Sequence, residues 1–270
     1  MPRYILAIDQ GTTSSRAVVF DQDAHPVSQH QIEIKQYYPH NGWVAHDPNE
    51  IWQTTLTCCQ QALKKAHLSA NEITALGISN QRETTVLWHR HTGKIIQQAI
   101  VWQDRRTTEI CEQLRAQQGV SQMLTKKTGL LLDPYFPSTK IKWLLDNIPG
   151  VREDAAQGNI AFGTIDSFLL WKLTNGKVHA TDITNASRTM LFNIHTLQWD
   201  DERLAVFDMP KSLLPEVHEN CAQFGETAAN LLGKAIPITA MIGDQQAAMI
   251  GQACFQPGMV KSTYGTGCFL

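Results

Sequence analysis

Two short polar segments of this sequence combine residue types suited to the transfer of a phosphoryl group. The first, at residues 9–16, reads Asp-Gln-Gly-Thr-Thr-Ser-Ser-Arg and follows an apolar run at 4–8. The second, at residues 243–246, reads Gly-Asp-Gln-Gln and follows an apolar run at 236–242. Each places a carboxylate just past a predicted buried strand. We interpret the first as a site for a phosphoryl donor and the second as the base that activates an acceptor.

The first segment is predicted to form the turn of a β-hairpin, because a second apolar strand follows it at residues 16–21. Gly11 lets the backbone N–H groups of the turn approach an anion closely. Hydroxyl groups and one guanidinium add donors for phosphate oxygens. These candidate nucleotide-binding residues are Thr12, Thr13, Ser14 and Arg16.

Asp9, the acidic residue of the first segment, is the candidate ligand of a metal ion. Mg²⁺ takes oxygen ligands and loses its waters reluctantly, so we expect Asp9 to hold the ion through water. The alternative is that the whole segment is an ordinary polar hairpin turn. The order Asp-x-Gly-Thr-Thr-Ser directly after a buried strand favours the phosphate interpretation.

Asp244, in the second segment, is the candidate catalytic residue. It follows a predicted buried strand and precedes a predicted helix at 245–253. As a general base, its carboxylate would take the proton from the acceptor hydroxyl while that oxygen attacks the γ-phosphorus. Most of the rate enhancement should come from positioning and from neutralisation of charge by Mg²⁺. The alternative is that Asp244 only caps the helix.

A third segment, Arg82-Glu83, has the chemistry to bind a neutral polyol. It follows the predicted strand at 73–79, at a strand end where α/β proteins place ligands. The guanidinium donates to hydroxyl oxygens, the carboxylate accepts from hydroxyl hydrogens, and their opposite charges limit the cost of burial. Trp102 and Tyr135 can add an apolar wall and one hydroxyl partner. The alternatives are a solvated surface ion pair and two aromatic residues of the core.

Predicted strands and helices alternate along the chain, which is typical of an α/β domain. Residues 47–50, Asp-Pro-Asn-Glu, mark one helix start with an N-cap, a proline at the first helical position and an acidic residue at the third. The predicted strands lie near 4–9, 16–21, 27–34, 73–79, 84–89, 99–102, 160–163, 236–242 and 259–264. The predicted helices lie at 48–66, 105–117, 138–148 (capped by Ser138), 166–173 and 245–253.

Composition and charge restrict the class of protein. The 270 residues are 18% charged and carry a formal net charge of −2, so nothing indicates binding to nucleic acid or to an anionic membrane. No apolar run is long enough to span a bilayer, and no signal peptide is visible. The cysteines show no CxxC or metal-ligand spacing, which predicts reduced thiols and a cytoplasmic location. They are Cys58, Cys59, Cys111, Cys221, Cys254 and Cys268.

The last nine residues form an incomplete pattern. Residues 262–270 repeat the strand–Gly/Thr–strand pattern of the first hairpin and stop within its second strand. A strand without a partner leaves an unpaired edge, so we expect the chain to be a truncated piece of a longer protein. The alternative is a natural C-terminal strand that pairs with another chain.

These segments together resemble the FGGY family of carbohydrate kinases, and within it the kinases that act on glycerol. Residues 9–16 are similar to the family's first phosphate-binding hairpin, and residues 80–84 to its glycerol-binding loop. Residues 264–269 are similar to the start of its second phosphate-binding hairpin. The similarity covers essentially the whole chain. Further matching segments lie at 133–136, 184–192 and 243–246.

The resemblance implies an α/β fold of the ribonuclease H-like, actin-like ATPase kind, with a mixed five-stranded sheet flanked by helices. Residues 1–250 would form the N-terminal kinase domain, and residues 251–270 the truncated beginning of the C-terminal domain. It also implies ATP and Mg²⁺ as cofactors, glycerol as the acceptor, sn-glycerol 3-phosphate as the product, and a homo-oligomer at full length.

Roles for single residues follow from the same resemblance. The implied glycerol-binding residues are Arg82, Glu83, Trp102, Tyr135, Asp244, Gln245 and Phe269, with Asp244 also catalytic. The implied nucleotide-binding residues are Thr12, Thr13, Ser14, Arg16 and Thr266, with Asp9 holding the metal ion. Because the family's adenosine-binding segment would lie beyond Leu270, we expect this chain alone to be inactive.

Two alternatives remain for the function. One is a related kinase that acts on a pentulose or another polyol, although the Arg82-Glu83 pair with Trp102 favours glycerol. The other is a polyol-binding module or a fragment that cannot catalyse the reaction.

Overall fold

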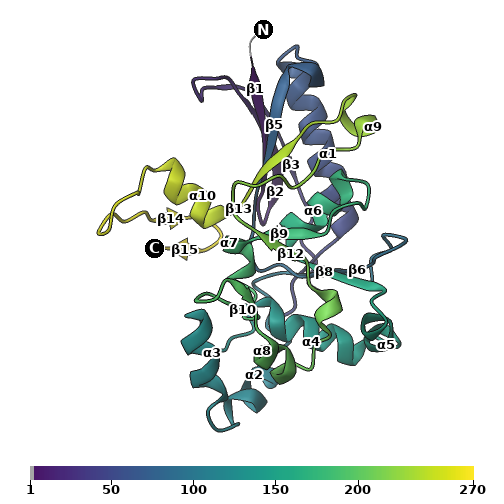
Figure 1. Cartoon of the computed structure of the whole chain (residues 1–270), viewed down its shortest axis with the longest axis vertical. Coiled ribbons are helices and arrows are strands. Elements are labelled where there is room, and N and C mark those ends of the chain that lie inside the picture. Colours follow the sequence, from purple (N-terminus) through teal and green to yellow (C-terminus); the bar gives the residue numbers. More distant parts are fainter. Residues whose placement is uncertain (1–2) are drawn as a thin grey trace.

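A mixed five-stranded sheet organises the upper half of the molecule in Figure 1, which draws a computed structural model that describes residues 3–270. The strand order is β13-β5-β1-β2-β3. Strand β1 pairs antiparallel with β2 and parallel with β5, and β13 extends the sheet parallel to β5. The strands are β1 (Tyr4–Gln10), β2 (Ser14–Phe20), β3 (Pro26–Glu33), β5 (Ile73–Asn80) and β13 (Ile238–Gly243).

The register of this sheet aligns the ends of its three parallel strands. Asn80 is paired with Gln10 on one side and with Gly243 on the other. Because parallel strands end at the same edge, the three polar segments that follow them in the sequence all start from one row. The side chains of the three segments can therefore contribute to one site.

Helix α1 (Pro48–Lys65) packs on β1, β2 and β3, and its first turn forms as the sequence predicts. Asp47 is the N-cap, and its carboxylate accepts from the N–H of Asn49 at 2.8 Å. Pro48 occupies the first helical position, where its missing N–H costs nothing. The helix buries Ile51, Cys58 and Cys59 in the same apolar core as the sheet and the mostly apolar helix α6 (Ile165–Leu173).

A second apolar core lies below the sheet in Figure 1, built mostly from helices. It contains the antiparallel pair β6 and β8 and the short hairpin of β10 and β11. The strands are β6 (Val86–His89), β8 (Ile160–Gly163), β10 (Phe192–Asn193) and β11 (Gln198–Trp199). The helices are α2 (Thr108–Arg115), α3 (Val120–Thr128), α4 (Pro137–Asn147), α5 (Val151–Ala156) and α8 (Asp201–Val206).

Short elements complete the fold, and the last of them project to one side in Figure 1. The connecting strands are β4 (Ala45–His46), β7 (Ala99–Ile100), β9 (Ala180–Asp182) and β12 (Glu216–His218). The connecting helices are α7 (Ile183–Ala186) and α9 (Ala229–Leu232), with 3₁₀ turns at Ala70–Glu72 and Lys211–Leu213. The projecting segment holds α10 (Asp244–Gly251), β14 (Thr263–Tyr264) and β15 (Cys268–Phe269).

The predicted α/β class and the five-stranded mixed sheet are confirmed. Two local predictions are wrong, and several short helices were not predicted. Ser138 lies inside α4, whose N-cap is Phe136, because Pro137 supplies the first helical residue. The strand predicted at 259–264 shrinks to β14, since Gly258 and Gly265 flank a mostly polar run. Helices α3 and α5 were missed because each starts after a glycine in left-handed conformation, without a capping side chain.

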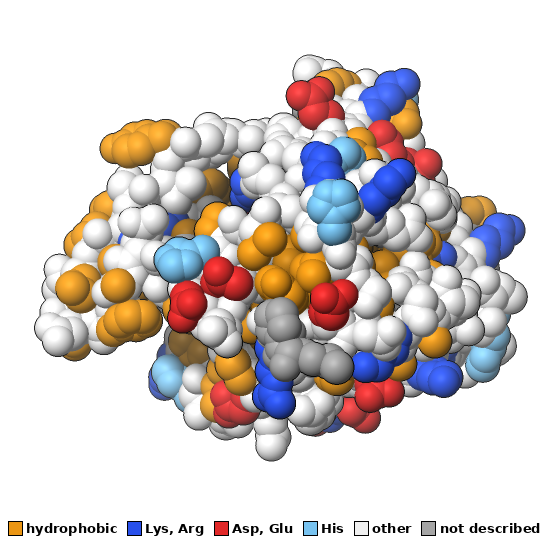
Figure 2. Space-filling model, turned by 90° about the horizontal axis from the view of Figure 1, so that it is seen from above, with side chains coloured by type: hydrophobic (Ala, Val, Ile, Leu, Met, Phe, Trp, Pro, Cys, Tyr) orange, Lys and Arg blue, Asp and Glu red, His pale blue; other side chains and the backbone are white. Residues whose placement is uncertain are grey.

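Figure 2 shows the face that carries the N-terminus, where acidic and basic side chains are interspersed. Apolar side chains gather on the projecting segment at its left edge, where Ile250, Phe255 and Val260 are exposed. Within residues 3–270, no helix combines the length and the apolar character needed to cross a membrane.

Candidate active site

A pocket of about 170 Å³ opens where the parallel strands end, between the sheet and the projecting segment. It suits a ligand of few heavy atoms, with polar and aromatic groups converging from distant parts of the sequence. Nine of its lining residues were predicted to act in the site: Thr12, Arg82, Glu83, Trp102, Tyr135, Asp244, Gln245, Thr266 and Phe269. The others are Gln81, Thr263, Gly265 and Gly267.

Arg82 lies between two carboxylates at the base of the pocket. Its Nε is 3.2 Å from Oδ1 of Asp244 and 3.7 Å from Oε1 of Glu83. Glu83 is only 2% exposed, and Arg82 is 7% exposed. Burial raises the pKa of Asp244, an effect that Arg82 opposes and Glu83 reinforces. The solvated surface ion pair considered from sequence is therefore excluded.

The start of α10 is held tightly against Arg82. A Cβ atom at Gly243 would lie 2.6 Å from Cδ of Arg82, so only glycine permits this approach. The N–H of Gly243 donates to Oγ1 of Thr184 at 2.8 Å, and Thr184 donates to the buried Asp182. These contacts fix where the next residue, Asp244, points.

Asp244 is the first residue of α10, and Gly243 occupies the N-cap position. Its Oδ1 accepts from the N–H of Gln245 at 2.7 Å, and no side chain caps this helix. Asp244 therefore does not occupy the N-cap position, although its carboxylate bonds one N–H of the first turn. The half-buried carboxylate of Asp244 also lines the pocket and pairs with Arg82.

Three aromatic side chains enclose the pocket. The ring centroid of Trp102 lies 5.6 Å from that of Tyr135 and 6.1 Å from that of Phe269. Burial raises the pKa of Tyr135, so its hydroxyl stays protonated and can donate. These rings provide the apolar wall that the sequence predicted, facing the charged groups of Arg82 and Glu83.

One hydrogen bond joins this wall to the first hairpin. Nε1 of Trp102 donates to Oγ1 of Thr12 at 2.8 Å. Nε2 of Gln36 donates to the carbonyl oxygen of Thr12 at 2.9 Å, and the buried His46 contacts Gln36 at 2.7 Å. Thr12 is therefore fixed from both sides, at the boundary between the acceptor pocket and the hairpin.

Asp9, Thr13, Ser14 and Arg16, also predicted to act in the site, do not line the pocket. Asp9 and Arg16 face each other across β1 and β2 and form an ion pair, with Arg16 Nε 3.1 Å from Asp9 Oδ2. Ser14 accepts from Nε2 of Gln31 at 2.9 Å, and Thr13 is exposed. These groups form a separate, more open surface beside the pocket.

The oxygen donors here fit a hard cation such as Mg²⁺. The charge of Asp9 adds to the raised pKa of Asp244, after the larger effects of burial and of Glu83. Carboxylate oxygens are ligands that Mg²⁺ prefers, and an ion at Asp9 would replace Arg16 as its partner.

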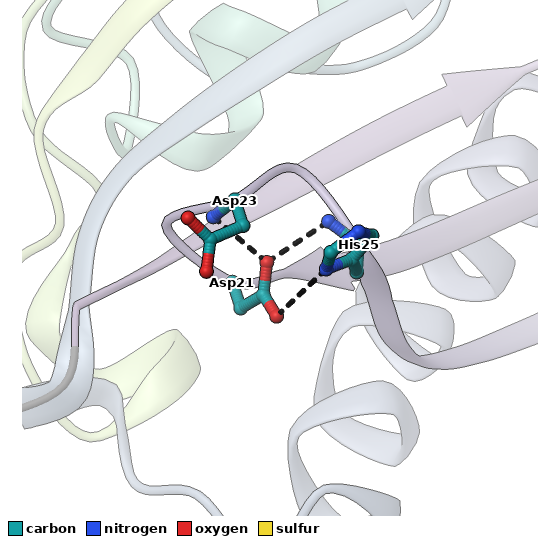
Figure 3. A group of neighbouring side chains, drawn as sticks. All are labelled: Asp21, Asp23 and His25. Atoms are coloured by element: carbon teal, nitrogen blue, oxygen red, sulfur yellow. Dashed lines mark hydrogen bonds and ion pairs between the residues drawn. The ribbon is translucent and has the colours of Figure 1, made fainter.

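A different acidic cluster has an ordinary explanation. Figure 3 shows Asp21, Asp23 and His25 in the turn between β2 and β3. Oδ1 of Asp21 accepts from the backbone N–H groups of Asp23 and His25, both at 2.9 Å. The aspartate therefore closes its own turn, far along the sheet from the pocket.

Sequence reasoning missed several polar side chains that hold the predicted ones in place. Arg188 donates through Nε to Oε1 of Glu83 at 2.7 Å, and Lys261 donates to Oε1 of Gln245 at 2.6 Å. Lys140 donates to the backbone of Glu83 and of Tyr135. No local pattern reveals such contacts, because the partners are far apart in sequence.

Comparison with known proteins places this geometry in context. The family model described as the FGGY family of carbohydrate kinases, N-terminal domain, matches residues 4–251. The chain is 64% identical over 270 residues to a glycerol kinase of Coxiella burnetii, covering 54% of that protein. It is 62% identical over 267 residues to a glycerol kinase of Alcanivorax borkumensis, again covering 54%. The chain thus spans about half the length of the curated relatives it matches.

Solved structures agree with the fold. The crystal structure of Plasmodium falciparum glycerol kinase with ADP matches with a TM-score of 0.93 at 37% identity, covering 99% of this chain and 53% of that one. A xylulose kinase from Rhodospirillum rubrum matches with a TM-score of 0.87 at 20% identity, covering 97% of this chain and 53% of that one, which bears on the fold alone.

Proposed function

Because the chain belongs to the FGGY family of carbohydrate kinases, we propose that it carries the acceptor site and part of the donor site of an ATP-dependent glycerol kinase. The product would be sn-glycerol 3-phosphate. The observation that carries this proposal is the small pocket in which the charges of Arg82, Glu83 and Asp244 face an aromatic wall. Relatives that are named glycerol kinases, at 64% and 62% identity, support the same acceptor.

The polar groups of the pocket match a short polyol. Arg82 and Gln245 offer donors, Glu83 and Asp244 offer acceptors, and the hydroxyl of Tyr135 can do either. The carbon chain of glycerol would lie against the aromatic rings. Since the pocket is small and the carboxylates of Asp244 and Glu83 are already paired with Arg82 and Arg188, a neutral ligand with adjacent hydroxyls is favoured over an anion.

In the proposed mechanism, Asp244 removes the proton from the acceptor hydroxyl. Its raised pKa, which results mainly from burial, brings its basicity closer to the working pH. Arg82, 3.2 Å away, holds the carboxylate toward the pocket. Thr12, Thr13, Ser14, Arg16 and Thr266 would bind phosphate oxygens of ATP. Mg²⁺, held near Asp9, would supply neutralisation of phosphate charge.

We also propose the division of the chain at about residue 250, with residues 251–270 beginning a second domain. We further propose that the full-length protein is cytoplasmic and forms a homo-oligomer. Residues 1–270 alone should bind glycerol without turnover, because phosphoryl transfer needs the nucleotide held in line with the acceptor.

Titration calorimetry with this chain tests the proposal. Glycerol should bind weakly and Glu83→Gln should weaken this binding about 5- to 150-fold, whereas Glu109→Gln on the exposed face of α2 should not weaken it. Xylulose, titrated in parallel, tests the pentulose alternative. Absence of glycerol binding to the folded wild-type chain contradicts the proposal.

Catalysis requires a chain of the relatives' length. Residues 1–270 can be joined to the second half of the Coxiella burnetii relative. The first half of that relative matches all 270 residues of this chain. Glycerol-dependent ADP release by the hybrid, together with its absence from residues 1–270 alone, is the expected result. Turnover by residues 1–270 alone, abolished by Asp244→Asn, would show that the missing half is dispensable.

A further inference from the structure

Lys140 has an ionisable amine that is buried completely within the helical part of the molecule. It lies in the first turns of α4 and is 0% exposed. Its Nζ donates to the carbonyl oxygen of Glu83 at 2.9 Å and to that of Tyr135 at 2.7 Å. A lysine is almost never buried in this way without a specific partner.

The two acceptors belong to two walls of the pocket. Glu83 follows β5 at the end of the sheet, whereas Tyr135 belongs to the loop that leads into α4. The side-chain amine of Lys140 therefore connects the main chains of these two segments. A shift of either segment would therefore break a hydrogen bond in a region closed to water, where an unpaired carbonyl is costly.

The number of donors matches the number of acceptors only when the amine is neutral. An ammonium group carries three N–H donors, and Nζ makes two hydrogen bonds to the residues described. Burial lowers the pKa of Lys140 to about 7. The charged groups that face it are the acidic Glu83, Asp104 and Asp133, which oppose this shift, and the basic Arg106, which adds to it.

We infer that Lys140 is a positioning residue of the polyol pocket, which sets the distance between the carboxylate wall at Glu83 and the aromatic wall at Tyr135. This inference rests on the proposed function. Lys140 does not line the pocket, so its effect on a ligand acts through the two residues that it holds. A purely structural lysine would instead change stability and leave ligand affinity and local exchange near the pocket unaltered.

Lys140→Met tests this, because methionine keeps most of the volume and removes the donors. Lys142→Met is the matched control, since Lys142 lies on the same helix and pairs with Asp146 at the surface. We expect Lys140→Met to weaken glycerol binding about 5- to 100-fold by calorimetry, as misplacement of binding groups does. Lys142→Met should change glycerol affinity by less than about twofold, because Lys142 is remote from the pocket.

Hydrogen exchange separates this inference from the proposed function, because it needs no ligand. Lys140→Met should speed exchange of the amides at 82–86 and of those at 135, 136 and 138, relative to those of β1 and β5. If the wild-type chain fails to bind glycerol, the proposed function is contradicted, while faster exchange at these two segments still supports the positioning role. Unchanged exchange at both segments overturns the inference.

A wild-type measurement covers the case in which Lys140→Met does not fold. The carbon-13 shift of Lys140 Cε, assigned by comparison with Lys140→Gln, should move on saturation with glycerol, while that of Lys142 stays fixed. Glycerol binding that leaves the Lys140 signal unmoved overturns the inference, as does a folded Lys140→Met variant with wild-type affinity.

Discussion

The acceptor pocket and the first hairpin differ in how their charged side chains are buried and paired. In the pocket, the side chains of Arg82 and Glu83 are 8% and 2% exposed and each contacts further fixed groups. In the hairpin, the side chains of Arg16 and Asp9 are 42% and 37% exposed and pair with each other. A buried charge needs its partners before the ligand arrives, whereas an exposed pair can exchange partners at little cost.

This difference fits the ligands proposed for the two regions. A neutral polyol brings no charge, so the pocket must already balance its own and present donors and acceptors at fixed positions. A nucleotide with Mg²⁺ brings charges of both signs. The metal ion can then pair with Asp9 and the phosphate with Arg16, in place of the ion pair between these two residues. The comparison therefore predicts large effects of substitutions in the pocket and smaller effects on stability in the hairpin.

The largest effect is expected for Asp244→Asn in the hybrid chain with a complete second half. The amide keeps the shape of the carboxylate but cannot accept the hydroxyl proton, so turnover should fall about 10²- to 10⁴-fold. Glycerol affinity should change far less. Coupled measurement of ADP release, with calorimetry on the same preparation, checks both. Turnover close to wild type would leave Asp244 as a positioning residue only.

The next effect concerns stability and pH. Since the pKa of Lys140 is about 7 in the folded chain and near 10.5 when unfolded, the unfolded state binds more protons between these values. The free energy of unfolding should therefore rise with pH from about 7 to 10.5, by at most about 1.4 kcal/mol per pH unit. Below pH 7 both states are protonated and this contribution levels off.

Urea unfolding from pH 6 to 10 checks this expectation, with Lys140→Met as the reference that removes the group. The difference between the two free-energy curves isolates the contribution of Lys140 from those of other residues. If the difference in unfolding free energy does not change with pH, the buried amine of Lys140 stays charged. Its two hydrogen bonds would then leave a third N–H donor without an acceptor among the residues described.

A third, smaller effect is expected for Glu83→Gln on glycerol affinity. The substitution removes one acceptor and leaves Arg188 and Arg82 facing a neutral group. Loss of one buried polar partner costs about 1–3 kcal/mol, which corresponds to about 5- to 150-fold in affinity. The same change in a solvated pair would cost almost nothing. Wild-type affinity in Glu83→Gln would therefore place Glu83 outside the ligand contacts.

The sequence predicted those parts of the site that depend on local order. Strand ends and the residues directly after them, such as Arg82-Glu83 and Asp244, could be placed because apolar strands and polar segments alternate clearly. The aromatic wall of Trp102, Tyr135 and Phe269 needed the family resemblance, because core aromatics give the same local signal. Their gathering around one pocket agrees with that resemblance.

Contacts between distant segments could not be predicted. Lys140 sits in an amphipathic helix where a lysine normally faces solvent, and only the tertiary fold places two carbonyl groups around it. Likewise, Asp9 and Arg16 were assigned to different ligands, but the register of β1 and β2 sets them opposite each other. Register depends on pairing along the whole strand, and this cannot be read from a single segment.

The smallest stability effect is expected for Arg16→Gln in the hairpin, and it tests the donor half of the comparison. An exposed ion pair contributes about 0–1 kcal/mol, so the midpoint of urea unfolding should barely move. Glycerol affinity should also be unchanged, because Arg16 does not line the pocket. The Michaelis constant for ATP in the hybrid chain, however, should rise, since a guanidinium bound to phosphate is a strong charge-assisted contact. Loss of more than about 2 kcal/mol of stability, or an unchanged Michaelis constant, would mean that Asp9 and Arg16 form a structural pair rather than an exchangeable one.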